Sequence, residues 1–278
     1  MNFQTTEPPF RFHQGTQPLL ISMPHVGTHV PPELAARLTD EARQVPDTDW
    51  HLERLYGFAE AMGASVLAAT HSRYVIDLNR PPDGASLYPG QSVTGLCPID
   101  TFDSTPVYRD QADLPGEAEV AARRDAIWYP YHRQLEAELA RLKAAHGAVV
   151  LWDAHSIRSV LPRFFDGKLT DLNFGSAKGA SCDPGLSSAL MAIGGTVPGH
   201  TAVLNGRFTG GHITRQHGHP EKGVHAIQLE MTQCSYMQEA LPFDYLPEVA
   251  GRIQPYLQRM VEAALAFALA QARSATGA

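Results

Sequence analysis

The sequence has few cysteines and no long hydrophobic run. It contains 3 cysteines in 278 residues, Cys97, Cys182 and Cys234, and none of them belongs to a CxxC motif. This spacing predicts neither a disulfide framework nor a thiolate zinc site, and it fits a reducing compartment. No stretch approaches the roughly 18 apolar residues of a membrane span, and residues 1–11 lack the apolar segment of a signal peptide. We therefore expect a cytoplasmic protein with no membrane partner.

Basic charge is also scarce. The chain has 22 Lys and Arg against 29 Asp and Glu, a formal net charge of −7, and no polybasic tract. Nucleic-acid-binding domains usually carry a basic patch, so we expect no nucleic-acid partner. Histidine, in contrast, occurs 13 times. Because imidazole is the commonest metal ligand in proteins, the composition favours a metal site.

Segments typical of strands and helices alternate along the chain. The hydrophobic patterns predict strands over 19–23, 65–69, 74–78, 148–152, 171–174, 201–204 and 224–231. They predict helices over 31–38, 49–62, 117–146 with a kink at Pro130, 184–193 and 246–272, and loops over 79–115 and 206–218. Such alternation predicts an α/β fold in which a mixed, mostly parallel sheet lies between helical layers, as a three-layer sandwich. We expect a single domain over residues 1–278, whereas the oligomeric state is not indicated.

Two of the predicted strands lead into a histidine. His25 follows the strand 19–23 by two residues, and His155 follows the strand 148–152 by three. A single loop histidine is more often structural. Ligand sites in α/β proteins, however, lie at the carboxyl ends of the strands, so two such histidines indicate one shared site.

A third ligand is expected near these histidines. Zinc hydrolytic sites typically use two histidines and one carboxylate, with an open position for water. Asp47 and Asp49 lie at a predicted helix start, where an aspartate is often only a cap; we favour Asp49 and leave Asp47 as the alternative. Asp153 lies two residues before His155 in an extended segment, so it shares the face of His155 and is expected to orient that ring.

Glu230 is a candidate general base. It lies alone in the apolar segment 226–231, and a carboxylate inside such a strand is unfavourable unless it is paired or used. A carboxylate near a metal can activate water, which favours a catalytic role for Glu230. The alternative is a glutamate at the end of a strand that faces solvent.

Arginines gather in the segments around the predicted site. A guanidinium presents a fork of donors that matches a carboxylate, so such a cluster predicts an acidic substrate, although each arginine has the alternative of a solvated loop charge. The paired glycines of the segment 205–215 build a backbone surface that an anion can approach closely. The candidate arginines are Arg73, Arg80, Arg207 and Arg215.

Five sequence blocks together resemble one known family. The blocks are Ser22–Gly27, Asp47–His51, Asp77–Pro81, Asp153–Ser156 and Thr209–Arg215. Their order and spacing are similar to those of the N-formylglutamate deformylases, also called N-formylglutamate amidohydrolases, over roughly residues 15–270. The resemblance implies a zinc-carboxypeptidase-like (phosphorylase/hydrolase-like) α/β fold, and hydrolysis of N-formyl-L-glutamate to formate and L-glutamate in histidine degradation.

The resemblance also implies a metal centre. The ion would be held by His25, His155 and an acidic residue of the block Asp47–Asp49, with zinc expected and another divalent metal as the alternative. In zinc carboxypeptidases a glutamate ligand follows the first histidine after two residues, and this chain has Thr28 at that offset. The peptidase pattern therefore does not identify the carboxylate ligand.

Roles for three further residues follow from the resemblance. Asn79 and Arg80 are similar to the Asn-Arg pair that holds a substrate carboxylate in zinc carboxypeptidases, and Glu230 lies where their catalytic glutamate would fall. We thus predict a metallo-hydrolase that cleaves the formamide of a small acidic N-formyl amino acid.

Three other functions are kept as alternatives. The substrate of such a hydrolase could be a related N-acyl acidic amino acid, such as N-formylaspartate or formiminoglutamate. Two histidines and a carboxylate also form the triad of non-haem iron oxygenases, although those triads usually lie on β-rich scaffolds. The last alternative is a binding protein for an acidic metabolite, without catalysis, in which the histidines are structural.

Overall fold

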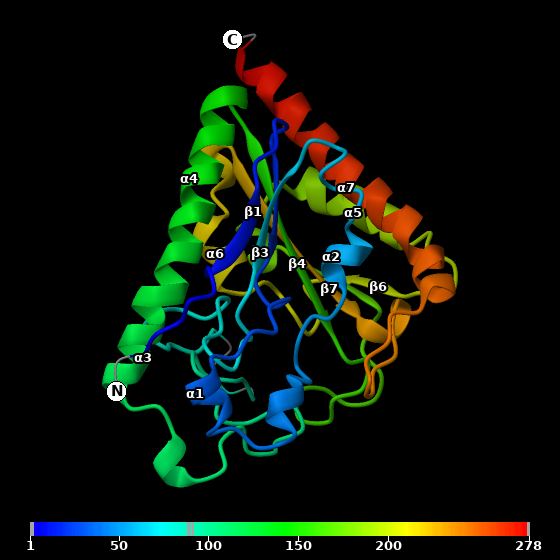
Figure 1. The fold of residues 1–278 in the computed structure, drawn as a ribbon. Helices are drawn as coiled ribbons and strands as arrows, with labels where there is room; N and C mark the ends of the chain where they lie inside the picture. The colour runs from blue at the N-terminus through cyan, green and yellow to red at the C-terminus, as the bar shows by residue number, and fades with distance from the viewer. Residues whose placement is uncertain (1–2, 88–89, 91, 277–278) are drawn as a thin grey trace.

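A computed structural model describes residues 3–87, 90 and 92–276, and within them seven strands form one sheet (Figure 1). The strand order is β1-β3-β2-β4-β7-β5-β6. The pairs β1–β3 and β5–β7 are antiparallel and the other four are parallel, which confirms the predicted mixed, mostly parallel sheet. The strands are β1 (Phe10–His13), β2 (Leu19–Met23), β3 (Ser65–Ala69), β4 (Val149–Ile157), β5 (Leu172–Gly175), β6 (Ala202–Leu204) and β7 (Val224–Thr232).

Helices cover both faces of this sheet. In Figure 1 the helix α4 lies on one side of the strands, and α5 and α7 lie on the other. None of the helices within the described residues combines the length and the apolar character needed to cross a membrane. The helices are α1 (Pro32–Ala35), α2 (Leu52–Leu55), α3 (Glu117–Arg123), α4 (Tyr129–His146), α5 (Pro184–Gly194), α6 (His212–His217) and α7 (Pro247–Thr276).

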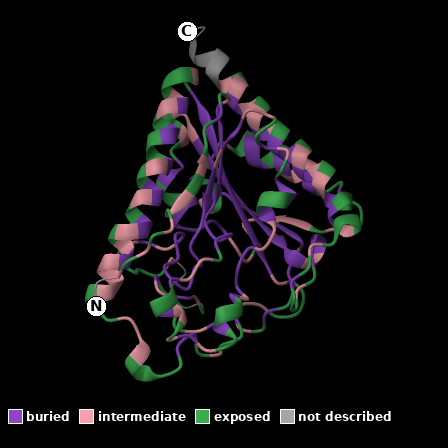
Figure 2. Ribbon diagram, in the orientation of Figure 1, coloured by how far each residue is buried: buried purple, intermediate pink, exposed green. Residues whose placement is uncertain are grey.

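The central strands are apolar because both of their faces are buried. Every residue of β2 is buried (Figure 2). Side chains of a strand point alternately to its two faces, so Leu19 and Ile21 pack with α5 and α7, whereas Leu20 packs with α4. A continuous apolar run is the expected pattern for a parallel strand between two helical layers.

The predicted helix over 117–146 is confirmed, with its irregular turn before Pro130. Between α3 and α4 the chain makes one wider, π-helical turn over Arg124–Trp128, and Pro130 lies at the start of α4. Proline lacks an N–H group and crowds the preceding turn, and a widened turn is a common way to accommodate it.

The predicted strand over 74–78 is wrong. All five residues are buried, but they form turns: Val75 N donates to Ser72 O at 2.9 Å, and Asp77 N donates to Leu96 O at 2.7 Å. Their apolar side chains pack with α4 outside the sheet. A short apolar run indicates that a segment is buried. It does not show that the backbone of the segment pairs with a strand.

The predicted helix over 49–62 is much shorter in the structure. Only α2 is helical, because His51 has a positive φ of 62° before it and the chain continues after Tyr56 as turns. Gly57 within that region also disfavours a helix. The side chains expected to face the core, such as Leu52 and Ala59, are nevertheless buried.

Three further differences from the prediction are two unexpected elements and one longer strand. The short strand β1 and the helix α6, which begins inside the predicted loop 206–218, were not expected. The strand β4 continues to Ile157, so His155 lies within it. This extension is explained by its parallel partner β7, which pairs with β4 over the whole stretch from Val149 to Ile157.

The turn after β2 passes very close to the chain after β3. A Cβ atom on Gly27 would lie 2.3 Å from His71 O and 2.5 Å from the carbonyl carbon of Thr70. Because those atoms belong to the backbone, only glycine fits, and this contact holds the turn that carries His25.

Replacing Gly27 by alanine is therefore expected to destabilise the fold. The backbone must move to admit the methyl group, which should lower the free energy of unfolding by about 1–3 kcal/mol. The matched control is Gly251→Ala in α7, where a Cβ meets nothing within 4 Å and better helix propensity should add about 0.5–1 kcal/mol. Urea unfolding measures both, and equal stabilities of the two variants would contradict the proposed close contact.

Candidate active site

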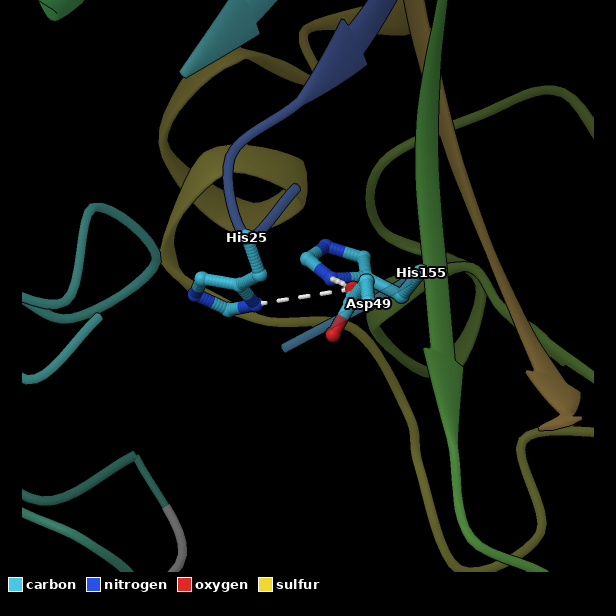
Figure 3. A group of neighbouring side chains, drawn as sticks. All are labelled: His25, Asp49 and His155. Carbon is cyan, nitrogen blue, oxygen red and sulfur yellow. Dashed lines mark hydrogen bonds and ion pairs between the residues drawn. The ribbon is translucent and has the colours of Figure 1, made fainter. Parts of the chain in front are cut away.

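His25, Asp49 and His155 meet in one buried group. One ligand atom from each residue lies within 4.8 Å of the others, and Figure 3 shows the three side chains pointing toward one another. Asp49 Oδ2 lies 3.8 Å from His25 Nδ1 and 3.2 Å from His155 Nδ1. Parallel pairing of β2 with β4 brings the two histidines together, and Asp49 N donates to His25 O at 3.0 Å, which holds Asp49 beside them.

A second carboxylate lies behind each imidazole ring. His25 Nε2 is 2.7 Å from Asp77 Oδ1, and His155 Nε2 is 3.1 Å from Asp153 Oδ2, the contact expected from the sequence. Metal-ligating histidines usually donate their other N–H to a carboxylate in this way, which directs Nδ1 of each ring to the shared centre.

These residues fit a divalent cation. His25 Nδ1 is buried and has no hydrogen-bond partner, which is unfavourable for a polar atom unless a ligand completes it. Two imidazole nitrogens and one carboxylate form a typical three-residue zinc set. The group His25, Asp49 and His155 is thus a candidate metal centre.

Buried negative charge around the centre also favours a cation. Asp49, Asp77 and Asp153 are at most 1% exposed. The guanidinium of Arg73 opposes them at close range: Arg73 Nη2 lies 3.2 Å from Asp49 Oδ1, and Arg73 Nη1 lies 4.0 Å from Asp77 Oδ2. Burial alone would raise the pKa of Asp49, but its hydrogen bond with His155 and the charge of Arg73 hold that pKa below its ordinary value.

The other aspartate considered as a ligand has a structural position. Asp47 Oδ2 accepts hydrogen bonds from Tyr74 Oη at 2.6 Å and from Phe102 N at 2.8 Å. Asp47 therefore joins three loops beside the site, and it is Asp49 that lies with the two histidines.

A cavity opens over the candidate metal centre. It holds about 590 Å³ of empty space, part of it open to solvent. Polar and aromatic side chains line it together, as expected for a site that binds a small polar molecule. The polar lining includes His25, Arg73, Asn79, Arg80, His155, Arg207, Gln228 and Glu230, and the apolar lining includes Val93, Phe102, Ile157, Phe164 and Phe208.

Glu230 enters this cavity from β7. In the parallel register of β4 and β7 it is the partner of His155, so the two side chains lie on the same face of the sheet. Glu230 is 8% exposed, and burial raises its pKa to about 8, while the charge of His155 opposes that shift. The structure thus brings the candidate base beside the candidate ligands.

The candidate arginines do not all reach the cavity. Arg80 Nε donates to Thr94 O at 2.9 Å, and Arg207 Nε donates to Phe164 O at 2.7 Å, so both guanidinium groups are held in its wall. Arg73 also lines the cavity. Arg215 is exposed, is not part of the lining, and donates to Gly210 O at 2.8 Å.

Asn79 lines the cavity and also contacts other protein groups. Its Nδ2 lies 2.9 Å from His155 Nε2, and its Oδ1 accepts a hydrogen bond from Ile213 N at 2.8 Å. Asn79 Nδ2 also donates to Asp153 Oδ2 at 3.4 Å, so Asn79 joins the carboxylate behind His155 to the start of α6.

Sequence reasoning assigned no role to two residues of the site, Asp77 and Gln228. Asp77 lies in the apolar run 74–78, and the argument applied to Glu230, a carboxylate within an apolar segment, would have found it. Gln228 lies two residues before Glu230, so the period of a strand places it on the same face.

The family model of N-formylglutamate amidohydrolase matches residues 17–237. The chain belongs to the N-formylglutamate amidohydrolase family. The resemblance drawn from the five sequence blocks is confirmed, and membership identifies the chain as an amidohydrolase of the deformylating type.

Two similar proteins carry the name N-formylglutamate deformylase. The protein from Pseudomonas aeruginosa is 51% identical over 256 residues, which cover 92% of this chain and 96% of its own. The protein from Pseudomonas putida is 49% identical over 256 residues, covering 92% of this chain and 95% of its own. The similarity therefore spans nearly the whole length of all three chains.

Two solved structures share the fold. The crystal structure of N-formylglutamate amidohydrolase from Ralstonia eutropha JMP134 has a TM-score of 0.79 and 25% identity, and covers 96% of this chain and 100% of its own. A protein from Agrobacterium tumefaciens has a TM-score of 0.70 at 19% identity, with 94% and 96% coverage, and shows the fold alone. The α/β fold is thus supported, while its relation to the zinc carboxypeptidases stays a prediction.

Replacement of either candidate ligand histidine should remove bound metal. His25→Ala and His155→Ala each delete one of the two imidazole ligands, so the purified variants should retain far less divalent metal than the parent while keeping the fold. His146→Ala is the control, because His146 ends α4 outside the cavity lining, where its Nε2 lies 2.9 Å from Thr16 O. Elemental analysis after gel filtration measures the metal; full metal content in either site variant would contradict the assignment.

Proposed function

We propose that this chain hydrolyses N-formyl-L-glutamate to formate and L-glutamate, that the reaction requires a divalent metal ion, and that it serves histidine degradation. The observation that carries the proposal is the buried group His25, Asp49 and His155, whose two histidines line a cavity that also presents Glu230 and arginines. The printed names of the relatives, N-formylglutamate deformylase, support the substrate. A single metallo-hydrolase domain over residues 1–278 in the cytoplasm is part of the same proposal.

The metal would be held by Nδ1 of both histidines and by the carboxylate of Asp49. Zinc suits two imidazoles and one carboxylate, and another divalent ion is the alternative. When bound, the ion supplies Lewis acidity, which polarises the formyl carbonyl and makes a water molecule easier to deprotonate. Asp77 and Asp153 hold the two rings in the orientation that this requires.

Glu230 moves the proton in this proposal. A carboxylate oxygen of Glu230 accepts a proton from the attacking water, whose oxygen bonds to the formyl carbon. As the C–N bond breaks, Glu230 returns that proton to the departing amine, which leaves as L-glutamate while the formyl carbon leaves as formate. A buried carboxylate with a raised pKa can perform both transfers near neutral pH.

Arginines select a substrate with two carboxylates. Arg80 and Arg207 are each anchored through Nε to a backbone carbonyl, which orients the guanidinium before the substrate arrives. A pre-oriented guanidinium loses less freedom when it binds a carboxylate. Arg73 and Asn79 also line the cavity and complete the proposed binding surface, and we leave out Arg215, which lies outside the lining.

Substrate charge is expected to govern turnover. N-formyl-L-glutamine keeps the size of the substrate but lacks the charge of the side-chain carboxylate, so its kcat/KM should be about 10-fold or more below that of N-formyl-L-glutamate.

Arg80→Ala should raise KM for N-formyl-L-glutamate by about 10-fold or more, because one proposed partner of a substrate carboxylate is lost. The control is Arg109→Ala, where Nε also donates to a backbone carbonyl, Leu38 O at 2.9 Å, away from the cavity.

A deformylation assay that follows formate gives these constants. If N-formyl-L-glutamine is turned over as well as N-formyl-L-glutamate, the arginines do not recognise the side-chain carboxylate. Including N-formyl-L-aspartate in the panel distinguishes the proposed substrate from a shorter acidic relative.

Glu230→Gln should impair chemistry far more than binding. Glutamine keeps the shape and hydrogen bonding of the side chain but cannot accept the proton, so kcat should fall by about 10² to 10⁴ while KM changes little. Metal content should equal that of the parent, because Glu230 is not a proposed ligand. Near-normal kcat, or loss of the metal, would each show that this role is wrong.

A further inference from the structure

Gln228 is a buried polar residue of β7 that the proposed function does not use. It lies two residues before Glu230, so both side chains project from the same face of the strand, and both line the cavity. Gln228 is only 3% exposed. A buried amide is unfavourable unless both of its ends are hydrogen bonded, so its partners are informative.

The partners of Gln228 determine which way its amide points. Gln228 Oε1 accepts a hydrogen bond from Gly211 N at 2.7 Å, and Gln228 Nε2 donates to Glu230 Oε2 at 3.3 Å. A backbone N–H can only donate, so the amide oxygen must face Gly211. The amide nitrogen must then face the carboxylate.

The backbone donor at Gly211 is itself held in place. A Cβ atom on Gly211 would lie 2.3 Å from Asn79 Nδ2, so the backbone at Gly211 packs directly on Asn79. Asn79 in turn lies 2.9 Å from His155 Nε2 and accepts the N–H of Ile213. The anchor of Gln228 is therefore fixed by the same residues that support a candidate ligand.

We propose that Gln228 is a positioning residue for Glu230. Its amide holds Oε2 of the carboxylate and leaves Oε1 for proton transfer, while Gly211 holds the amide. Catalysis by a general base depends on its direction as well as on its presence, because the base must lie within hydrogen-bond reach of the proton it takes. The inference rests on the proposed function, since it assumes that Glu230 handles the proton.

Gln228→Glu removes the amide donor that faces Glu230. Glutamate has the same length and keeps an oxygen for Gly211 N, but it places a second oxygen in front of Glu230 where a donor stood. We expect kcat for N-formyl-L-glutamate to fall by about 10- to 100-fold, because Glu230 loses the hydrogen bond that orients it and gains a second carboxyl group as its neighbour, with KM within about threefold of the parent. Metal content and the affinity for the product L-glutamate should stay at the parent values.

Two further variants accompany this change. Gln228→Met has similar volume and can neither donate to Glu230 nor accept from Gly211, so it should reduce kcat at least as much, and it decides the question if the glutamate variant does not fold. The matched control is Gln254→Glu in α7, which removes an amide donor to Leu55 O at 2.8 Å away from the cavity and should leave kcat unchanged.

The decisive comparison repeats these changes in the Glu230→Gln background. If Gln228 acts through Glu230, Gln228→Glu and Gln228→Met should lower the residual kcat no further there, because the base they position is already gone. Equal reductions in both backgrounds, or loss of metal from the Gln228 variants, would overturn the inference alone. Near-normal kcat in Glu230→Gln by itself would overturn the proposed role of Glu230, and the inference with it.

Discussion

The parallel pairing of β4 with β2 on one side and β7 on the other is the constraint on which the site depends. It places Ser22 opposite Asp153, and it places His155 opposite Glu230. Each strand therefore contributes to the site at the same end of the sheet: β2 leads into His25, β4 carries His155, and β7 carries Glu230. If the register of either pairing shifted by one residue, the side chain of His155 or Glu230 would point to the other face of the sheet, into an apolar layer.

The same arrangement gathers an unusual amount of buried negative charge. Asp49, Asp77, Asp153 and Glu230 lie within one polar region, and the buried guanidinium of Arg73 is shared between Asp49 and Asp77. Unpaired buried charge is strongly unfavourable, so the region either takes up protons or takes up cations. Burial raises the pKa of Glu230 and the charge of Asp49 adds to that shift, while the proposed metal ion would neutralise part of the remaining negative charge.

The sequence predicts those site residues that stand out from their immediate neighbours in the chain. His25 and His155 stand out because a histidine follows an apolar strand, and Glu230 stands out because a carboxylate interrupts one. Local sequence does not show which of Asp47 and Asp49 is the ligand, because both lie in one loop. Tertiary contacts distinguish them: Asp47 bonds to Tyr74 and Phe102, whereas Asp49 lies beside His155.

Backbone conformation was predicted less well than burial. The run 74–78 is buried as expected, yet its hydrogen bonds go to turns and to Leu96. The region 49–62 keeps its apolar face without the helix, since conformations such as that of His51 are set by packing around the site. The spacing of hydrophobic residues indicates which side chains are buried in the core. It says little about which backbone groups each residue hydrogen bonds to.

The widened turn ahead of Pro130 contacts the backbone of Arg80, which lines the cavity. Trp128 lies in that turn, and its indole N–H donates to the backbone oxygen of Arg80 at 3.0 Å. Trp128, in the helical layer, therefore helps to fix the backbone of Arg80 in the wall of the cavity. A turn that departs from regular helix geometry thereby influences where the Arg80 guanidinium lies relative to His25 and His155.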